Sequence, residues 1–154
     1  MKIVVVSDNH GNYSVLKEIL DAHQDADYYF HLGDSEMEID EIKPFCGVRG
    51  NVDFDYNFPF DKVIDVGEHS FYLTHGNAYS SDVNLLSKAA KNLSCDFVLF
   101  GHTHSFYNQT IDGIRVINPG SCSRPKDGTK PSYAIITIND NQIDVKRVDI
   151  ELKC

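Results

Sequence analysis

The sequence predicts an α/β (α+β) fold in which two mixed β-sheets pack together and helices lie outside them. Two observations predict this class. The first half of the chain alternates short apolar runs with amphipathic segments, which is the pattern of parallel strands connected by helices. The last third contains apolar runs joined by short turns such as Asp112-Gly113, which is typical of antiparallel hairpins. No repeat or linker interrupts the 154 residues, so we expect a single domain over residues 1–154.

Short runs of β-branched and aromatic residues predict the strands in order along the chain. The first run, K-I-V-V-V-S, is continuously apolar in its centre, as expected of a central strand that is covered on both faces. Later runs flank turn signals at Gly67-Glu68-His69 and Asn139-Asp140-Asn141, which predict hairpins. The predicted strands cover residues 2–7, 28–32, 46–48, 62–66, 70–74, 97–100, 106–111, 114–117, 132–138 and 142–148.

Apolar residues at three-to-four spacing predict the helices. One helix begins near Ser14, whose hydroxyl is expected to cap it, and Ser81 is expected to cap a second over residues 82–92. A short acidic helix is predicted over residues 35–43, where Pro44 ends it. The aromatic segment 54–60 contains a proline and is expected to be a loop packed over the domain.

Composition limits the function classes. A hydrophobic fraction of 42% and a charged fraction of 24% are those of a soluble globular protein, and no apolar run is long enough to span a membrane. The N-terminus lacks the pattern of a signal peptide, so we expect a cytoplasmic protein. The four widely spaced cysteines predict free thiols rather than a disulfide or zinc framework. A net charge of −9 argues against a nucleic-acid-binding surface.

Potential metal ligands follow five of the predicted strands. All are oxygen or nitrogen donors: Asp8, His10, Asp34, Asn51, His75, His102 and His104. Seven such donors exceed the needs of one tetrahedral zinc and suit two divalent ions that share a carboxylate. Without thiolates, the set favours manganese, iron, zinc or cobalt over copper(I) or an iron–sulfur cluster.

Two spacings refine this prediction. Asp8 and His10 are two residues apart in a segment expected to be extended, so both side chains should point towards one ion. Asp34 stands alone at its strand end, after a glycine that permits close approach of the backbone, and is therefore the expected bridging carboxylate.

Six motifs occur in order along the chain: D-x-H, G-D, G-N-x-D, H-G, G-H-T-H and N-P-G-S, from Asp8 to Ser121. In this set the chain resembles the calcineurin-like metallophosphoesterase superfamily, specifically its small bacterial and archaeal phosphodiesterases. The resemblance implies a four-layer sandwich of two mixed sheets flanked by helices. It also implies a hydrolase that acts on a small phosphate ester, either a phosphodiester or an activated phosphomonoester.

The resemblance further implies a ligand set and a mechanism. One ion would be held by Asp8, His10, Asp34 and His104, and the other by Asp34, Asn51, His75 and His102. A hydroxide bridging the two ions would attack phosphorus in line. The expected ions are Mn²⁺, with Zn²⁺, Fe²⁺, Ni²⁺ or Co²⁺ as alternatives. Substrate contacts are expected from Asn51, Asn77 and Arg124.

Two departures from the family pattern affect proton transfer. Val52 stands where the protein-phosphatase branch has a histidine, and Asn77 stands where many small members have the second histidine of H-G-H. Neither side chain can protonate a leaving group, so slow turnover of alkyl phosphates is expected.

Several alternatives remain open from the sequence. Each donor has a structural interpretation, as a helix cap, a turn residue or a buried histidine. Asp53 is expected to orient Asn51 or a ligand imidazole, and His31 to be a packed strand histidine. The 118–121 loop is expected to shape the rim behind the metals. The alternative function is a protein-interaction scaffold. A retromer subunit that resembles this fold is such a scaffold and has a weakened metal site, whereas all seven donors are intact here. A single-metal hydrolase of carbon–nitrogen bonds fits less well, and a homo-oligomer is compatible with the apolar strand edges.

Overall fold

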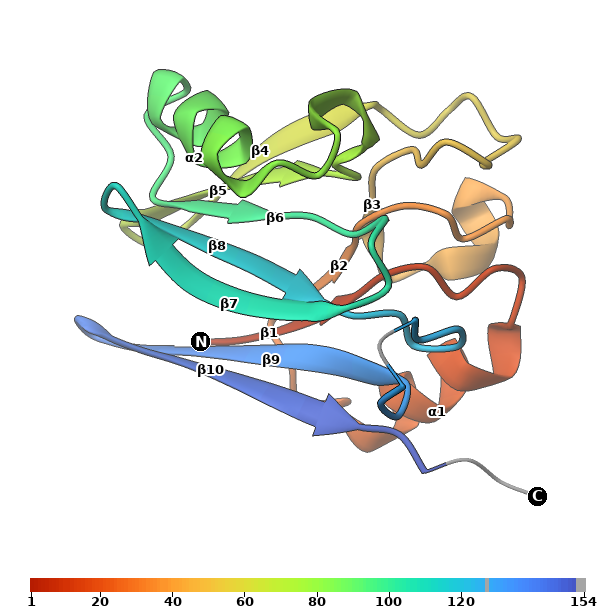
Figure 1. Cartoon of the computed structure of the whole chain (residues 1–154). Helices are drawn as coiled ribbons and strands as arrows, with labels where there is room; N and C mark the ends of the chain where they lie inside the picture. The colour runs from red at the N-terminus through yellow and green to blue at the C-terminus, as the bar shows by residue number, and fades with distance from the viewer. Residues whose placement is uncertain (127, 152–154) are drawn as a thin grey trace.

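A computed structural model describes residues 1–126 and 128–151 and contains two mixed β-sheets (Figure 1). In the first sheet, called sheet A, the strand order is β10-β9-β1-β2-β3. Its central strand β1 pairs in parallel with β2 and antiparallel with β9. The strands of sheet A are β1 (Lys2–Val6), β2 (Tyr28–His31), β3 (Cys46–Gly47), β9 (Ser132–Asn139) and β10 (Gln142–Asp149).

The second sheet, called sheet B, has the strand order β4-β5-β6-β8-β7. Its central strand β6 is parallel to both β5 and β8, and antiparallel hairpins add the two edge strands. The strands of sheet B are β4 (Asp61–Val66), β5 (His69–Thr74), β6 (Phe97–Leu99), β7 (Phe106–Ile111) and β8 (Ile114–Pro119).

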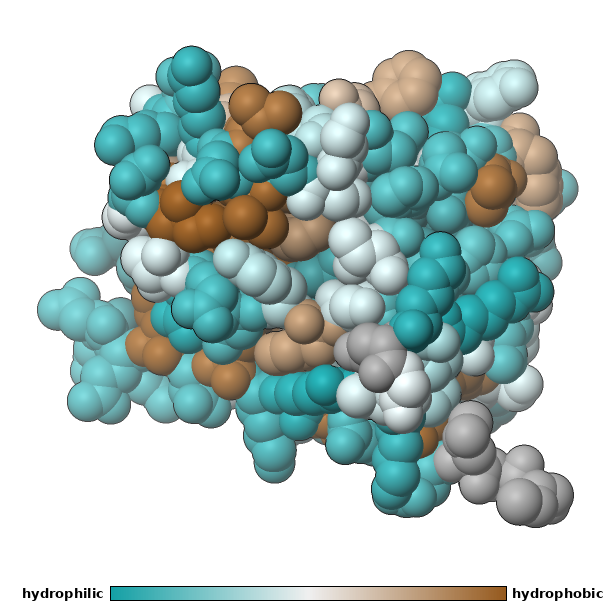
Figure 2. All heavy atoms as spheres, in the orientation of Figure 1, coloured by the Kyte–Doolittle hydropathy of each residue, from teal (hydrophilic) through white to brown (hydrophobic). Residues whose placement is uncertain are grey.

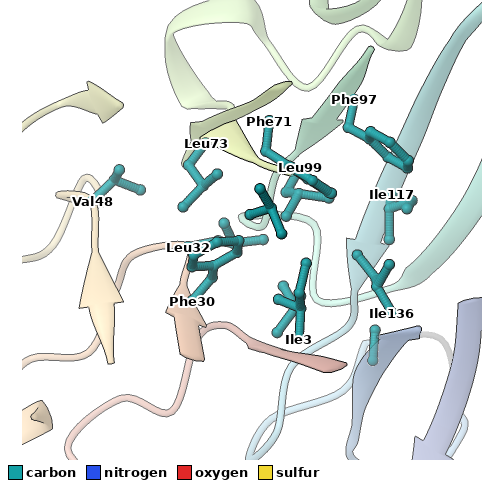
Figure 3. Close-up of a cluster of buried hydrophobic side chains, with 13 residues drawn as sticks. Ile3, Phe30, Leu32, Val48, Phe71, Leu73, Phe97, Leu99, Ile117 and Ile136 are labelled. Carbon is teal, nitrogen blue, oxygen red and sulfur yellow. The ribbon is translucent and has the colours of Figure 1, made fainter. Parts of the chain in front are cut away.

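Three apolar clusters hold four layers together, as the sequence predicts. Between the sheets, Phe30 and Leu32 of sheet A face Phe71, Leu73 and Leu99 of sheet B (Figure 3). A second cluster joins the outer face of sheet A to α1 (Tyr13–Ala22). A third joins the outer face of sheet B to α2 (Val83–Asn92). The order is therefore helix, sheet, sheet, helix (Figure 1).

The helix predicted over residues 35–43 is wrong. Only a 3₁₀ turn, η1 (Ile39–Ile42), forms there, because Glu36 has a left-handed backbone with a φ of 52° and carboxylates from the next loop hold the start of the segment. Asp53 accepts from the backbone of Glu36, and Asp55 accepts from that of Ile39.

The predicted helix caps are also wrong, by one or two residues. Asn12 rather than Ser14 caps α1, by accepting from the backbone of Val15. Asp82 rather than Ser81 caps α2. In both cases the true cap is an Asx side chain, which competes well with serine at this position.

The remaining surface features bear on the predicted thiols and on membrane association. Cys46, Cys95 and Cys122 are free thiols, and Cys154 lies outside the described residues. None of the described helices is long and apolar enough to cross a membrane. The face in Figure 2 is mostly hydrophilic, with apolar atoms gathered near α2.

Candidate metal centre

The loops that follow β1, β2, β3, β5 and β6 meet at one end of the sandwich and carry the predicted donors. Six of the seven form two groups in which one ligand atom from each residue lies within 4.8 Å of the others. The first group is Asp8, His10 and His104, and the second is Asp34, His75 and His102. The seventh donor, Asn51, joins the second group through its side-chain oxygen.

In the first group, two imidazoles meet beside a carboxylate. Nε2 of His10 lies 3.2 Å from Nε2 of His104, and Oδ1 of Asp8 lies 3.3 Å from the latter nitrogen. Asp8 is fully buried and His104 is 8% exposed. Three donor atoms of this kind at these spacings suit one divalent ion.

In the second group, Nε2 of His75 is the common contact. It lies 3.1 Å from Oδ2 of Asp34, 3.1 Å from Oδ1 of Asn51 and 3.3 Å from Nδ1 of His102. Nδ1 of His102 is also 3.1 Å from the same Asn51 oxygen. The residues are thus gathered as one set of four donors, with His75 and Asp34 buried.

The Asp8 carboxylate tests whether these residues fit a cation. Its Oδ2 accepts from the Ser7 hydroxyl at 2.5 Å and from the backbone of His102 at 3.1 Å. Its Oδ1 is buried without a hydrogen-bond partner among the described residues, although it faces histidines of both groups. An unpaired buried carboxylate oxygen is costly, and a cation between the two groups accounts for it. The donor set therefore fits divalent metal.

The backbone geometry differs from the extended segment that the sequence predicts. Asp8 and His10 have φ angles of 58° and 46°, and Asp34, His102 and His104 also have positive φ. Both side chains of the D-x-H motif do reach one group, but left-handed backbone rather than strand alternation directs them there. Non-glycine residues seldom adopt this conformation, and such strain clusters at functional sites.

Glycines let the ligand loops approach one another. A Cβ on Gly50 would overlap the Asp34 carboxylate, and a Cβ on Gly101 would overlap the Ser7 hydroxyl beside Asp8. A Cβ on Gly33 would meet the His75 ring. The glycines of the G-D, G-N and G-H motifs are thus required by close packing around the donors.

In three of the histidines, the ring nitrogen that points away from the cluster is held by a hydrogen-bond partner. Nδ1 of His75 donates to the Leu32 carbonyl at 2.7 Å, and Nδ1 of His104 donates to the Arg124 carbonyl at 2.6 Å. Nδ1 of His10 is 2.7 Å from Oε1 of Glu36. These contacts leave Nε2 of each ring directed at the cluster, which is how proteins orient metal-binding imidazoles.

Glu36 contacts the candidate site, which the sequence does not predict, because the contact joins it to His10, 26 residues away. We expect Glu36→Gln to weaken metal binding at the Asp8–His10–His104 group by about 10- to 100-fold, because the carboxylate orients His10. Competition with a metal-binding dye measures this change, and Glu38→Gln, on the same segment, is the control. Unchanged affinity in Glu36→Gln would contradict the assigned role.

The sequence suggests that Asp53 orients Asn51 or an imidazole, and the structure shows neither contact among the described residues. Instead its buried carboxylate accepts three backbone N–H bonds, from Asp34 at 2.8 Å, Glu36 at 2.9 Å and Gly50 at 2.6 Å. It therefore joins the loop after β2 to the loop after β3. The G-N-x-D spacing marks this residue, but not which groups it contacts.

His31 is a buried strand histidine, as predicted, and it also joins two ligand loops. Nε2 donates to the Asn9 side chain at 2.8 Å, and Nδ1 accepts from the backbone of Gly33 at 3.1 Å. Burial lowers the pKa of His31 to about 4, so the ring is neutral and both contacts persist. Behind the site, the Ser121 hydroxyl of the N-P-G-S loop donates to the Asp8 carbonyl at 2.8 Å.

A cavity of about 430 Å³ opens over the two groups. Its apolar rim includes Val52, and its cationic rim carries Arg124 and Lys126. Asn77, in the exposed turn η2 (Asn77–Tyr79), is not among the lining residues. The lining is His10, Asp34, Asn51, Val52, His102, His104, Arg124, Pro125 and Lys126.

Protons compete with metal for this site. Burial opposes protonation of His75, but its hydrogen bond to Asp34 and the charge of Asp8 together raise its pKa. The adjacent Asp8 carboxylate raises the pKa of His104, whereas burial lowers that of His102. Each group therefore contains one imidazole that stays protonated at higher pH than an ordinary histidine.

Metal affinity should consequently fall as pH decreases through the pKa values of His75 and His104, since only the neutral ring binds metal. We expect about a tenfold loss of affinity for each ion per pH unit below those values. Calorimetric titration in buffers of different ionisation heat should detect about one proton released per ion. Affinity that is independent of pH between 5 and 7 would contradict this expectation.

Comparison with known proteins supports the same chemistry. Residues 1–141 match the model of the calcineurin-like phosphoesterase superfamily domain. The chain is 32% identical to the probable metallophosphoesterase YsnB of Bacillus subtilis, covering 97% of this chain and 91% of that protein. It is 26% identical to the phosphodiesterase MJ0936 of Methanocaldococcus jannaschii, over 79% of this chain and 84% of that protein.

Solved structures share the architecture. A predicted phosphoesterase from Streptococcus pneumoniae superposes with a TM-score of 0.87 at 30% identity, covering 96% of this chain and 88% of that one. Vps29 from Entamoeba histolytica superposes with a TM-score of 0.76 at 23% identity, over 98% and 100% of the two chains, a likeness of fold alone. The chain belongs to the calcineurin-like phosphoesterase superfamily, with small bacterial and archaeal proteins among its relatives, and is a metal-dependent phosphoesterase.

Proposed function

We propose that the chain is a dinuclear phosphoesterase that hydrolyses small phosphodiesters or activated phosphomonoesters. The observation that carries this proposal is the buried, unpartnered Oδ1 of Asp8, which faces histidines of both donor groups. Asp8, His10, Asp34 and His104 would hold one ion. Asp34, Asn51, His75 and His102 would hold the other, with Asp34 shared.

The bridging role of Asp34 has electrostatic support. Its carboxylate contacts His75 of the second group directly, and that hydrogen bond and the nearby charge of His10 both lower its pKa, against the opposing effect of burial. One carboxylate thus responds to imidazoles on both sides. This is the environment expected of a residue between two cations.

The proposed roles of the chain's own residues are to position the substrate and, at Val52, to leave the leaving group without a proton donor. When bound, the two ions supply Lewis-acid stabilisation of phosphate oxygens and a water of pKa about 7 as nucleophile. Arg124 and the amide of Asn51 line the cavity and are the proposed contacts of the substrate, while the contact from Asn77 stays a prediction. Val52, 47% exposed on the same rim, offers no proton to a leaving group.

The scaffold alternative has less support. A scaffold needs no metal ligands, whereas here every predicted donor reaches one of the two groups, and the second ring nitrogens of His10, His75 and His104 are held by hydrogen bonds. Manganese as the resident metal, a cytoplasmic location and homo-oligomerisation stay predictions.

Metal analysis combined with kinetics tests the proposal. We expect about two metal ions per chain and turnover of bis(p-nitrophenyl) phosphate and of p-nitrophenyl phosphate under added Mn²⁺. Metal-replete protein that is inert towards both esters would favour a scaffold.

Leaving-group dependence gives a sharper expectation. General-acid help is worth about 10²–10⁴-fold, and Val52 cannot provide it. We therefore expect simple alkyl phosphates to be hydrolysed at least 10²-fold more slowly than an aryl diester. A steep dependence of kcat on leaving-group pKa is the measurement, and alkyl esters that turn over faster than aryl esters would contradict it.

A further inference from the structure

Arg124 differs from the other arginines of the chain, which all have partners for their side chains. Arg49 donates to the Phe58 carbonyl and stacks on an aromatic ring. Arg115 donates to the Asn108 side chain, and Arg147 pairs with Asp149. Within the described part of the chain, the Arg124 guanidinium has no such contact, yet it lines the cavity over the metal centre.

A second cation, Lys126, lines the same rim two residues later. No carboxylate among residues 1–126 and 128–151 lies within ion-pair distance of it. It lines the cavity together with His102 and His104, one imidazole from each donor group. Among the residues that the structure describes, neither cation has an ion-pair partner, and both line the same cavity.

Hydrogen bonds tie the backbone of this rim to the donor loops. The backbone of Arg124 donates to the Ser121 hydroxyl at 2.8 Å and accepts from His104 at 2.6 Å. The backbone of Lys126 donates to the His104 carbonyl at 3.4 Å. The two cations are thus carried on backbone that is fixed relative to the metal ligands.

Charge balance indicates what these cations bind. The carboxylates of Asp8, Asp34 and Glu36 lie at the donor groups, and together with the nucleophilic hydroxide they would balance two divalent ions, so one phosphodiester would bring one further negative charge into the cavity. Arg124 and Lys126 then exceed the needs of the scissile phosphate. A terminal phosphate carries about −1.5 to −2 charges and matches them. The net charge of −9 disfavours a long polyanion.

We propose that Arg124 and Lys126 form a subsite for a second phosphate of the substrate. The preferred substrates are small phosphodiesters in which one esterified group also carries a terminal phosphomonoester. This inference rests on the proposed phosphoesterase function and narrows its substrate class. Guanidinium and ammonium groups recognise phosphate through charge-assisted hydrogen bonds, which are stronger than neutral ones.

A matched pair of chromogenic esters tests the subsite: thymidine 5′-(p-nitrophenyl phosphate) and the same compound with a 3′-phosphate. We expect the wild-type protein to prefer the phosphorylated ester by about 10- to 100-fold in kcat/KM. In the Arg124→Gln/Lys126→Gln variant the ratio of the two kcat/KM values should fall to about 1. Lys130→Gln removes a cation of the same segment that pairs with Glu151, and should keep the wild-type ratio.

Equal turnover of the two esters by the wild-type protein, or an unchanged ratio in the double variant, would overturn the subsite. Failure of the metal-loaded protein to hydrolyse either ester would instead overturn the proposed function. In that case equilibrium binding still decides the subsite. Tighter binding of thymidine 3′,5′-bisphosphate than of thymidine 5′-phosphate, lost in the double variant, would support it, and equal binding would overturn it.

Discussion

Replacing Asp34 by asparagine is expected to reduce metal occupancy at both donor groups and to lower kcat/KM for an aryl diester by about 10³-fold or more. The carboxylate contacts His75 directly, and in the proposed arrangement it is shared by the two ions. An amide keeps the size of the side chain but loses its charge. Metal content after gel filtration and turnover of the diester measure the two effects.

His104→Ala is the matched control, because His104 belongs to the Asp8–His10–His104 group alone. We expect this variant to lose mainly one ion. Loss of the same single ion in both variants would refute a shared carboxylate. Circular dichroism of each variant without metal would separate unfolding from loss of ligand.

The second large effect concerns stability. Asp53→Ala should lower the free energy of unfolding of the metal-free protein by about 3–5 kcal/mol, because it leaves three backbone N–H groups without an acceptor. Asp53 is 8% exposed, so water replaces the lost carboxylate poorly. Urea denaturation of the metal-free protein measures this free energy.

Asp53→Asn should have a smaller effect, about 1–3 kcal/mol. Its single amide oxygen can still accept from Asp34 and Gly50, which both contact Oδ2, while its NH₂ group would face the backbone N–H of Glu36. The expected order of stability is thus wild type, Asp53→Asn, Asp53→Ala. An alanine variant within about 0.5 kcal/mol of the wild type would contradict the role of Asp53 in joining the two loops.

The sequence predicts the strands, and that the seven candidate donors lie together, because both depend on local pattern. The continuous run of β1 is buried on both faces, and the Asp112-Gly113 turn forms the predicted hairpin between β7 and β8. The seven donors follow strands whose ends the topology brings to one edge. The spacing of apolar residues and the position of polar residues at strand ends were sufficient to predict these features.

Features that depend on contacts between distant loops could not be predicted in this way. Residues 35–43 have a helical composition, but the Asp53 carboxylate binds their backbone instead. The left-handed conformations of Asp8 and His10 follow from contacts of their backbone with the loop after β2. The carboxylate of Glu36 reaches His10 for the same reason. The pattern of a single sequence does not show which residues of distant loops contact each other.

Each donor group takes ligands from both halves of the sandwich. Asp8 and His10 follow β1 of sheet A whereas His104 follows β6 of sheet B, and Asp34 of sheet A meets His75 and His102 of sheet B. A bound cation would therefore cross-link the two sheets and oppose their separation. An ion at 100 times its dissociation constant would add about 2.7 kcal/mol to the resistance to unfolding. Removal of the metal by a chelator should therefore weaken the packing of sheet A against sheet B as well as abolish catalysis.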